Sequence, residues 1–226
     1  LETSFGRVGI QGIFLEEDAA RIIEQKENQT VYRLDRLGIP LLEVATRPEI
    51  YFPEQVKETA LKVGEILRAC KVKRGIGTIR QDLNISSPGH PRVEIKGFQD
   101  PRMMIETIEK ELERQKKESG RKAISQVRRA NEDGTTNFLR PMPGEHRMYP
   151  ETDLALLKIS RDFINNVKES LPKLKSDIKG ELREKGLSEE MLKLVLDSNL
   201  LEEFEVLLKI YNNPNFIARI MFILPK

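Results

Sequence analysis

The chain has 226 residues, of which 33% are charged and 38% hydrophobic, so it can bury a substantial core in one or two domains. Its net charge of +2 means that any contact with a nucleic acid must rest on local basic patches. The single cysteine, Cys70, excludes an internal disulfide, and with two histidines it cannot build a Cys/His zinc site. No apolar run reaches membrane length, so we expect a cytoplasmic protein without a membrane-spanning segment.

The first part of the chain alternates strand-like runs with acidic residues. Residues 5–15 predict one strand and residues 30–34 a second. Between them, Asp18 is placed to cap a short helix that begins at Ala19, because acidic side chains suit the positive end of a helix. Alternatively, the triplet Glu16-Glu17-Asp18 supplies a carboxylate that handles metal or phosphate at a strand end. The pattern leaves both readings open.

A third strand is predicted over residues 41–46, and it contains one carboxylate. Glu43 shares a face with Leu41 and Ala45, where an unpaired charge would be costly. A buried salt bridge and a metal ligand are both credible, and we prefer the ligand. Glu17 and Glu43 are oxygen donors of the kind that Mg²⁺ uses together with substrate phosphates.

Two amphipathic helices flank a predicted hairpin. Helices are expected from Pro53 to about Ala69 and from Pro101 to about Lys117, each with an apolar stripe. Residues 78–96 contain two alternating runs joined by turn residues, which predict an antiparallel pair. Together these elements indicate an α+β fold, with helices over one face of a mainly antiparallel sheet.

The other face of the hairpin gathers charged and polar side chains. Arg80, Asp82 and Asn84 alternate with apolar residues in the first run, and Glu94 and Lys96 do so in the second. A solvated outer face is the ordinary explanation of such a pattern. A ligand-binding face is the alternative.

The rest of the chain is basic at first and then helical. Residues 116–129 hold six lysines and arginines, which predict either a polyanion-binding patch or a solvated helix end and loop. Residues 137–153 are rich in proline, arginine and acids, a composition typical of structured functional loops. From Ser160 onward, short helices are expected near 160–170, 173–185, 188–197, 200–211 and 214–224.

Five strings occur in an order that resembles the GatB/GatE family of tRNA-dependent amidotransferase subunits, and the last string resembles the archaeal branch. The strings are Leu15–Asp18, Asp35–Glu43, Gly77–Asn84, Glu94–Gly97 and Arg147–Asp153. The resemblance covers about residues 1–160 strongly. It implies a cradle-shaped antiparallel sheet similar to the glutamine synthetase/guanido kinase fold over residues 1–159, followed by a small all-helical domain over 160–226.

The resemblance also implies a reaction. Members of the family convert Glu-tRNA(Gln) to Gln-tRNA(Gln): ATP phosphorylates the glutamyl side chain, and ammonia then displaces the phosphate. A separate amidase- or asparaginase-like subunit, GatD in the archaeal pair, liberates the ammonia. ATP, Mg²⁺, a tRNA substrate and a hetero-oligomeric complex are therefore expected.

Site residues follow from the resemblance by motif. Glu17 and Glu43 match the Mg²⁺ carboxylates, although the sequence does not choose between Glu16 and Glu17. Arg80 is assigned to phosphate, Asp82 to metal or ammonia handling, and Lys96 to a second phosphate contact. Two further residues are expected to line the site or contact the tRNA acceptor end, namely Arg147 and Tyr149.

The chain departs from the family pattern in three places. The first half of the cradle, with further metal ligands, is expected before Leu1, an inserted domain is missing between about Lys117 and Lys122, and a tail is expected after the helical domain. One alternative is a non-catalytic tRNA-binding or scaffolding module that uses the 116–129 patch. Another is a free-standing small-molecule kinase or glutamine-synthetase-like enzyme, which would need activity on free glutamate.

Overall fold

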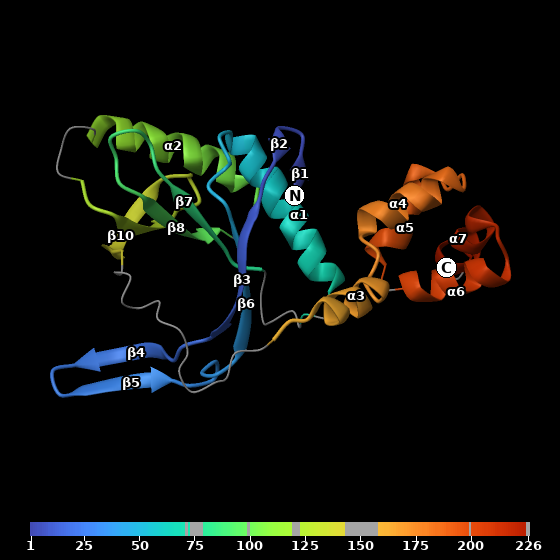
Figure 1. Ribbon diagram of the computed structural model, residues 1–226, viewed down its shortest axis with the longest axis horizontal. Coiled ribbons are helices and arrows are strands. Elements are labelled where there is room, and N and C mark those ends of the chain that lie inside the picture. The colour runs from blue at the N-terminus through green and yellow to red at the C-terminus, as the bar shows by residue number, and fades with distance from the viewer. Residues whose placement is uncertain are drawn as a thin grey trace. The chain divides into compact units, whose positions relative to one another are not determined.

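The computed structural model describes residues 1–70, 72, 79–98, 100–118, 123–142, 158–198 and 200–224. The chain divides into two compact units. One comprises Leu1–Gly64 with Arg74–Pro150, and the other comprises Glu65–Lys73 with Glu151–Lys226. Figure 1 shows strands concentrated in the first unit and short helices in the second. The predicted α+β class is confirmed, whereas the likeness to the glutamine synthetase/guanido kinase cradle stays a prediction.

A four-stranded sheet forms the centre of the first unit. Its order is β10 (Thr136–Pro141), β9 (Gln126–Ala130), β8 (Val93–Phe98) and β7 (Gln81–Ile85). β7 and β8 pair antiparallel, which confirms the predicted hairpin. β8 and β9 pair parallel instead, because the helix α2 (Met103–Glu118) connects them as a crossover. The sheet is therefore mixed.

Both predicted helices of this unit cover one face of that sheet. α2 and the N-terminal part of α1 (Pro53–Ala69) pack against alternate residues of β7 and β8. The fully or nearly fully buried side chains of this core are Val93, Ile95, Phe98, Met104 and Ile108. The alternation expected along the hairpin is thereby confirmed, and the polar residues of β7 and β8 lie on the opposite face.

The N-terminal strands form three separate two-stranded ladders. β1 (Glu2–Thr3) pairs with β2 (Gly6–Arg7), β3 (Ile10–Glu17) with β6 (Pro40–Thr46), and β4 (Arg21–Lys26) with β5 (Gln29–Arg33), all antiparallel. The helix predicted from Ala19 is wrong. Residues 21–26 form a strand because β-branched side chains such as Ile22 and Ile23 favour the extended conformation. Their backbone groups pair with β5 instead of forming helical hydrogen bonds.

The second unit is a cluster of short helices, as predicted. They are α3 (Arg161–Glu169), α4 (Lys175–Glu184), α5 (Glu189–Asp197), α6 (Leu201–Ile210) and α7 (Pro214–Phe222). Ser188 and Asn213 cap α5 and α7 through side-chain oxygens that accept from backbone N–H groups. Phe204, Leu192 and Val195 lie at the centre of the apolar core. Among the residues that the structure describes, no helix combines the length and apolar character that crossing a bilayer needs.

Gly97 ends the polar run of β8 in a conformation that other residues avoid. Its φ is +99°, so Gly97→Ala is expected to lower the free energy of unfolding by about 1–3 kcal/mol. The control is Gly180→Ala in the interior of α4, where a Cβ meets nothing within 4 Å. That change should stabilise by about 0.5–1 kcal/mol. Thermal and urea unfolding measure the free energy of unfolding of both variants. An equal change in the two variants would contradict a conformational constraint at Gly97.

Candidate functional site

Two carboxylates meet on one face of the β3–β6 ladder. Phe14 and Glu43 are direct partners, and Glu16, two residues along β3, shares their face. The Glu16 side chain lies close enough to Glu43 to raise the pKa of its carboxyl. Glu17 lies on the opposite face, beside Gly38. The structure therefore brings Glu16, and not the expected Glu17, together with Glu43, because a change of one residue along a strand reverses the face.

The surroundings of Glu43 oppose its ionisation, although the residue is exposed and not buried as the sequence suggested. Partial desolvation raises the pKa of this carboxyl most, and the nearby charges of Glu16 and Asp82 raise it further, while Lys96 acts in the opposite direction. The charges of Asp82 and Lys96 therefore reach Glu43 from the polar face of the β7–β8 hairpin. Two carboxyl groups that lie far from each other in the sequence, Glu16 and Asp82, thus act together on the ionisation of Glu43. We call Glu16, Glu43 and Asp82 the carboxylate cluster.

Lys96 is held within this cluster. Its Nζ lies 2.5 Å from Asp82 Oδ2 and 2.6 Å from Glu94 Oε1. Burial lowers the pKa of Lys96, but the hydrogen bonds from its ammonium to Asp82 and Glu94 outweigh that effect and raise it. Lys96 is therefore held in its protonated form, with its ammonium group in ion pairs with Asp82 and Glu94. The ion pair also restrains the side chain of Asp82.

Arg80, the other expected phosphate contact, lies at the edge of the site. One guanidinium nitrogen lies 3.9 Å from Asp18 Oδ2, and the side chain is 65% exposed. Asp18 also accepts a 2.8 Å hydrogen bond from Arg36. Such a long and solvated contact holds Arg80 weakly, so its guanidinium can turn toward a ligand at little cost.

Two further cations lie on the polar face, Arg129 from the predicted 116–129 patch and Arg140, which was not singled out from the sequence. Arg129 pairs with Lys96 across the β8–β9 ladder, and Arg140 pairs with Val127 across β9–β10. Paired residues share a face, so both arginines lie on the side of the carboxylate cluster. Both are exposed, and neither has a salt bridge to any residue that the structure describes. Their place on the polar face depends on the register of β9 and β10, which the sequence alone does not give.

The basic patch expected over residues 116–129 is divided by the sheet. Arg128 points to the opposite face from Arg129 and hydrogen-bonds to Thr136 and Gln126. Its guanidinium also lies 3.8 Å from the buried carboxylate of Glu111. Arg128 is thus a structural residue of the core. Of the other expected residues, Arg121, Lys122, Arg147 and Tyr149 lie outside the described ranges.

A metal ion at this cluster would need further ligands. Within the described ranges, no group of three or more His, Cys, Asp or Glu side chains is arranged to hold a metal by itself. Mg²⁺, however, usually takes one or two protein carboxylates and completes its shell with waters and phosphate oxygens. The Glu16–Glu43 pair fits a site of this kind, because a cation between the two carboxylates would offset the charges that oppose ionisation of Glu43.

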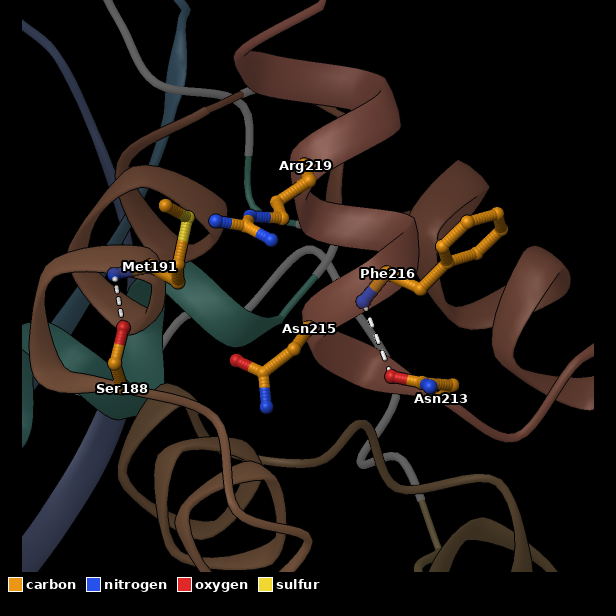
Figure 2. Close-up of a pocket in the computed structure, with 6 residues that line it drawn as sticks. All are labelled: Ser188, Met191, Asn213, Asn215, Phe216 and Arg219. Atoms are coloured by element: carbon orange, nitrogen blue, oxygen red, sulfur yellow. Dashed lines mark hydrogen bonds between the residues drawn. The ribbon is translucent and has the colours of Figure 1, made fainter.

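The helical unit has a separate pocket of about 460 Å³ at the starts of α5 and α7 (Figure 2). Ser188 and Asn213 line it, but their oxygens already accept from the backbone N–H groups of Met191 and Phe216. Asn215 donates to the carbonyl of Gly186. Arg219 is the one ionisable side chain among the lining residues, so this pocket offers no acid–base pair or nucleophile.

The polar sheet face carries both carboxylates and cations, and comparison with known proteins gives the family. A family model described as the GatB/GatE catalytic domain matches residues 1–165. The chain therefore belongs to the GatB/GatE family.

Several curated relatives are archaeal. The glutamyl-tRNA(Gln) amidotransferase subunits E of Pyrococcus furiosus and Pyrococcus abyssi are 29% and 30% identical over 365 residues, which cover all of this chain and 58% of each relative. The corresponding subunit of Thermococcus gammatolerans is 59% identical over 116 residues, or 51% of this chain and 18% of the relative. The chain spans little more than half the length of the two Pyrococcus relatives.

Proposed function

We propose that the chain is catalytic-domain sequence of a tRNA-dependent amidotransferase subunit, which converts Glu-tRNA(Gln) to Gln-tRNA(Gln) in the cytoplasm. The observation that carries this proposal is the carboxylate cluster beside unpaired arginines, in a chain whose residues 1–165 match the GatB/GatE catalytic domain. The names of the relatives support the same reaction.

The reaction has two steps. The glutamyl side-chain carboxylate attacks the γ-phosphorus of ATP, and ADP leaves. Ammonia then attacks the acyl phosphate, inorganic phosphate leaves, and the amide forms after loss of a proton. A partner amidase of the GatD type supplies the ammonia within a hetero-oligomer.

The residues of this chain take distinct parts in these steps. Glu16 and Glu43 would hold Mg²⁺, which would neutralise charge on the phosphate oxygens. Asp82, positioned by the ion pair with Lys96, accepts the proton that the attacking ammonia loses. Arg129 and Arg140 face the phosphate oxygens, because phosphoryl transfer needs fixed cations around the migrating charge. Arg80 is a further phosphate contact at the edge of the site.

The direct test supplies ammonium, ATP and Mg²⁺ together with Glu-tRNA(Gln), so that no amidase partner is needed. The expected products are Gln-tRNA(Gln), ADP and phosphate, and omission of ATP should abolish amide formation. The aminoacyl group is released and identified by chromatography or mass spectrometry. Absence of product from a chain that still binds the tRNA would favour the scaffolding alternative. Amidation of free glutamate would favour the small-molecule alternative.

A further inference from the structure

Among the described residues, the β4–β5 hairpin is a ribbon whose two strands pair only with each other (Figure 1). Every residue of β4 is exposed. Ile22 and Tyr32, direct partners in the ladder, are each about half exposed. An isolated two-stranded ribbon is only marginally stable in water, so this one is poised to gain contacts from a partner.

The base of the ribbon places like charges side by side. Arg21 and Arg33 are direct partners in the β4–β5 ladder. Directly opposed like charges destabilise a strand pair. Arg33 lies 3.2 Å from Asp35, an exposed contact, whereas Arg21 has no salt bridge to any residue in the described ranges. Positive charge is thus left without compensation at this point.

A third arginine extends this positive region toward the carboxylate cluster. Arg36, just beyond β5, donates to Asp18, and that carboxylate is shared with Arg80. Three guanidinium groups, those of Arg33, Arg36 and Arg80, therefore share Asp35 and Asp18 where the hairpin leaves the β3–β6 ladder, two residues beyond Glu16. We call the three arginines at the base of the ribbon the arginine collar, namely Arg21, Arg33 and Arg36.

We propose that the arginine collar binds the phosphate backbone of the tRNA acceptor end and guides its aminoacylated terminus to the carboxylate cluster. This inference rests on the proposed function. Guanidinium groups match phosphate oxygens with paired hydrogen bonds, and a polyanion relieves the opposition of Arg21 and Arg33. The excess positive charge favours RNA over a protein partner, and the position beside Glu16 is on the way to the reacting glutamyl group.

The test compares two double variants that remove the same charge. Arg21→Gln with Arg33→Gln changes the collar, whereas Arg7→Gln with Lys110→Gln removes two exposed ion pairs elsewhere in the same unit. Binding of fluorescently labelled tRNA(Gln) is measured over a KCl series. The collar variant is expected to bind about tenfold more weakly, and its slope of log K against log salt should be smaller by about 1–2. The control variant should stay within about twofold of the unmodified chain.

Thermal unfolding separates this role from a structural one. Because the collar substitutions remove a like-charge opposition, they should leave the unfolding temperature unchanged or slightly raised. A collar variant that binds tRNA as the control does would overturn the proposal while leaving the amidotransferase reading intact. Failure of the unmodified chain to bind tRNA at all would overturn both. A variant that loses binding only because it unfolds would also contradict the inference.

Discussion

Glu43→Gln is expected to reduce formation of Gln-tRNA(Gln) by about 100-fold or more while leaving tRNA binding unchanged. The substitution removes one carboxylate from the pair that we propose for Mg²⁺, and charge stabilisation by a metal ion is worth several kcal/mol in the transition state, as an order of magnitude. Product formation from ammonium and ATP measures the loss, and a tRNA-binding assay serves as the comparison. Retained amidation would remove Glu43 from the metal site.

The neighbouring glutamates provide a matched control. Glu16→Gln should behave like Glu43→Gln, because both side chains lie on one face of the β3–β6 ladder. Glu17→Gln, on the opposite face, should retain nearly full activity. If Glu17→Gln is the inactive variant instead, the register-based assignment is incorrect and the assignment from the family motif holds.

Glu43→Gln should also change the pH dependence of stability, which can be measured without an activity assay. Since folding raises the pKa of Glu43, the folded chain binds this proton more tightly than the unfolded chain does. The stability that Glu43 contributes is complete below its ordinary pKa and is lost as pH rises through the raised value. Glu43→Gln should therefore be more stable than the unmodified chain at neutral pH, with a difference that shrinks toward pH 4. Thermal unfolding across that range measures it.

Glu111→Met is expected to cause the largest loss of stability, about 3–5 kcal/mol. The Glu111 carboxylate is completely buried and accepts hydrogen bonds from Arg114, Gln115 and Thr136. Removal of this carboxylate also leaves the half-buried Arg128 without its nearest anion, and breaking one side of a buried ionic network is strongly destabilising. Urea unfolding measures the free energy.

Glu113→Met on the same helix is the control, since Glu113 is exposed and the change should cost less than about 1 kcal/mol. Burial raises the pKa of Glu111, but its hydrogen bonds, chiefly from Arg114, outweigh burial and lower it. The stability from this carboxylate is therefore present above its ordinary pKa and is lost as pH falls through the lowered value. The difference between Glu111→Met and the unmodified chain should narrow in acid. A constant difference would contradict an ionised Glu111.

Local patterns in the sequence were sufficient for most elements. The alternation around Leu83 and Ile95 predicted the β7–β8 hairpin and its buried face, and proline and serine signals located the helices closely. These features depend on neighbours within a few residues, so they can be read along the chain. The strand at Arg21–Lys26 was missed because its partner β5 overrides the local signal for a helix cap.

The site itself depended on register, which only the tertiary structure supplies. The sequence alone showed that the motif strings carrying these carboxylates and arginines occur in the order typical of the GatB/GatE family. It did not decide between Glu16 and Glu17, or between Arg128 and Arg129, because adjacent residues of a strand face opposite ways and the choice of face is made by the pairing of whole strands. The tertiary structure also places the charges of Asp82 and Lys96 within electrostatic reach of Glu43. Partial desolvation and neighbouring charge, which no local pattern contains, gave Glu43 its altered ionisation.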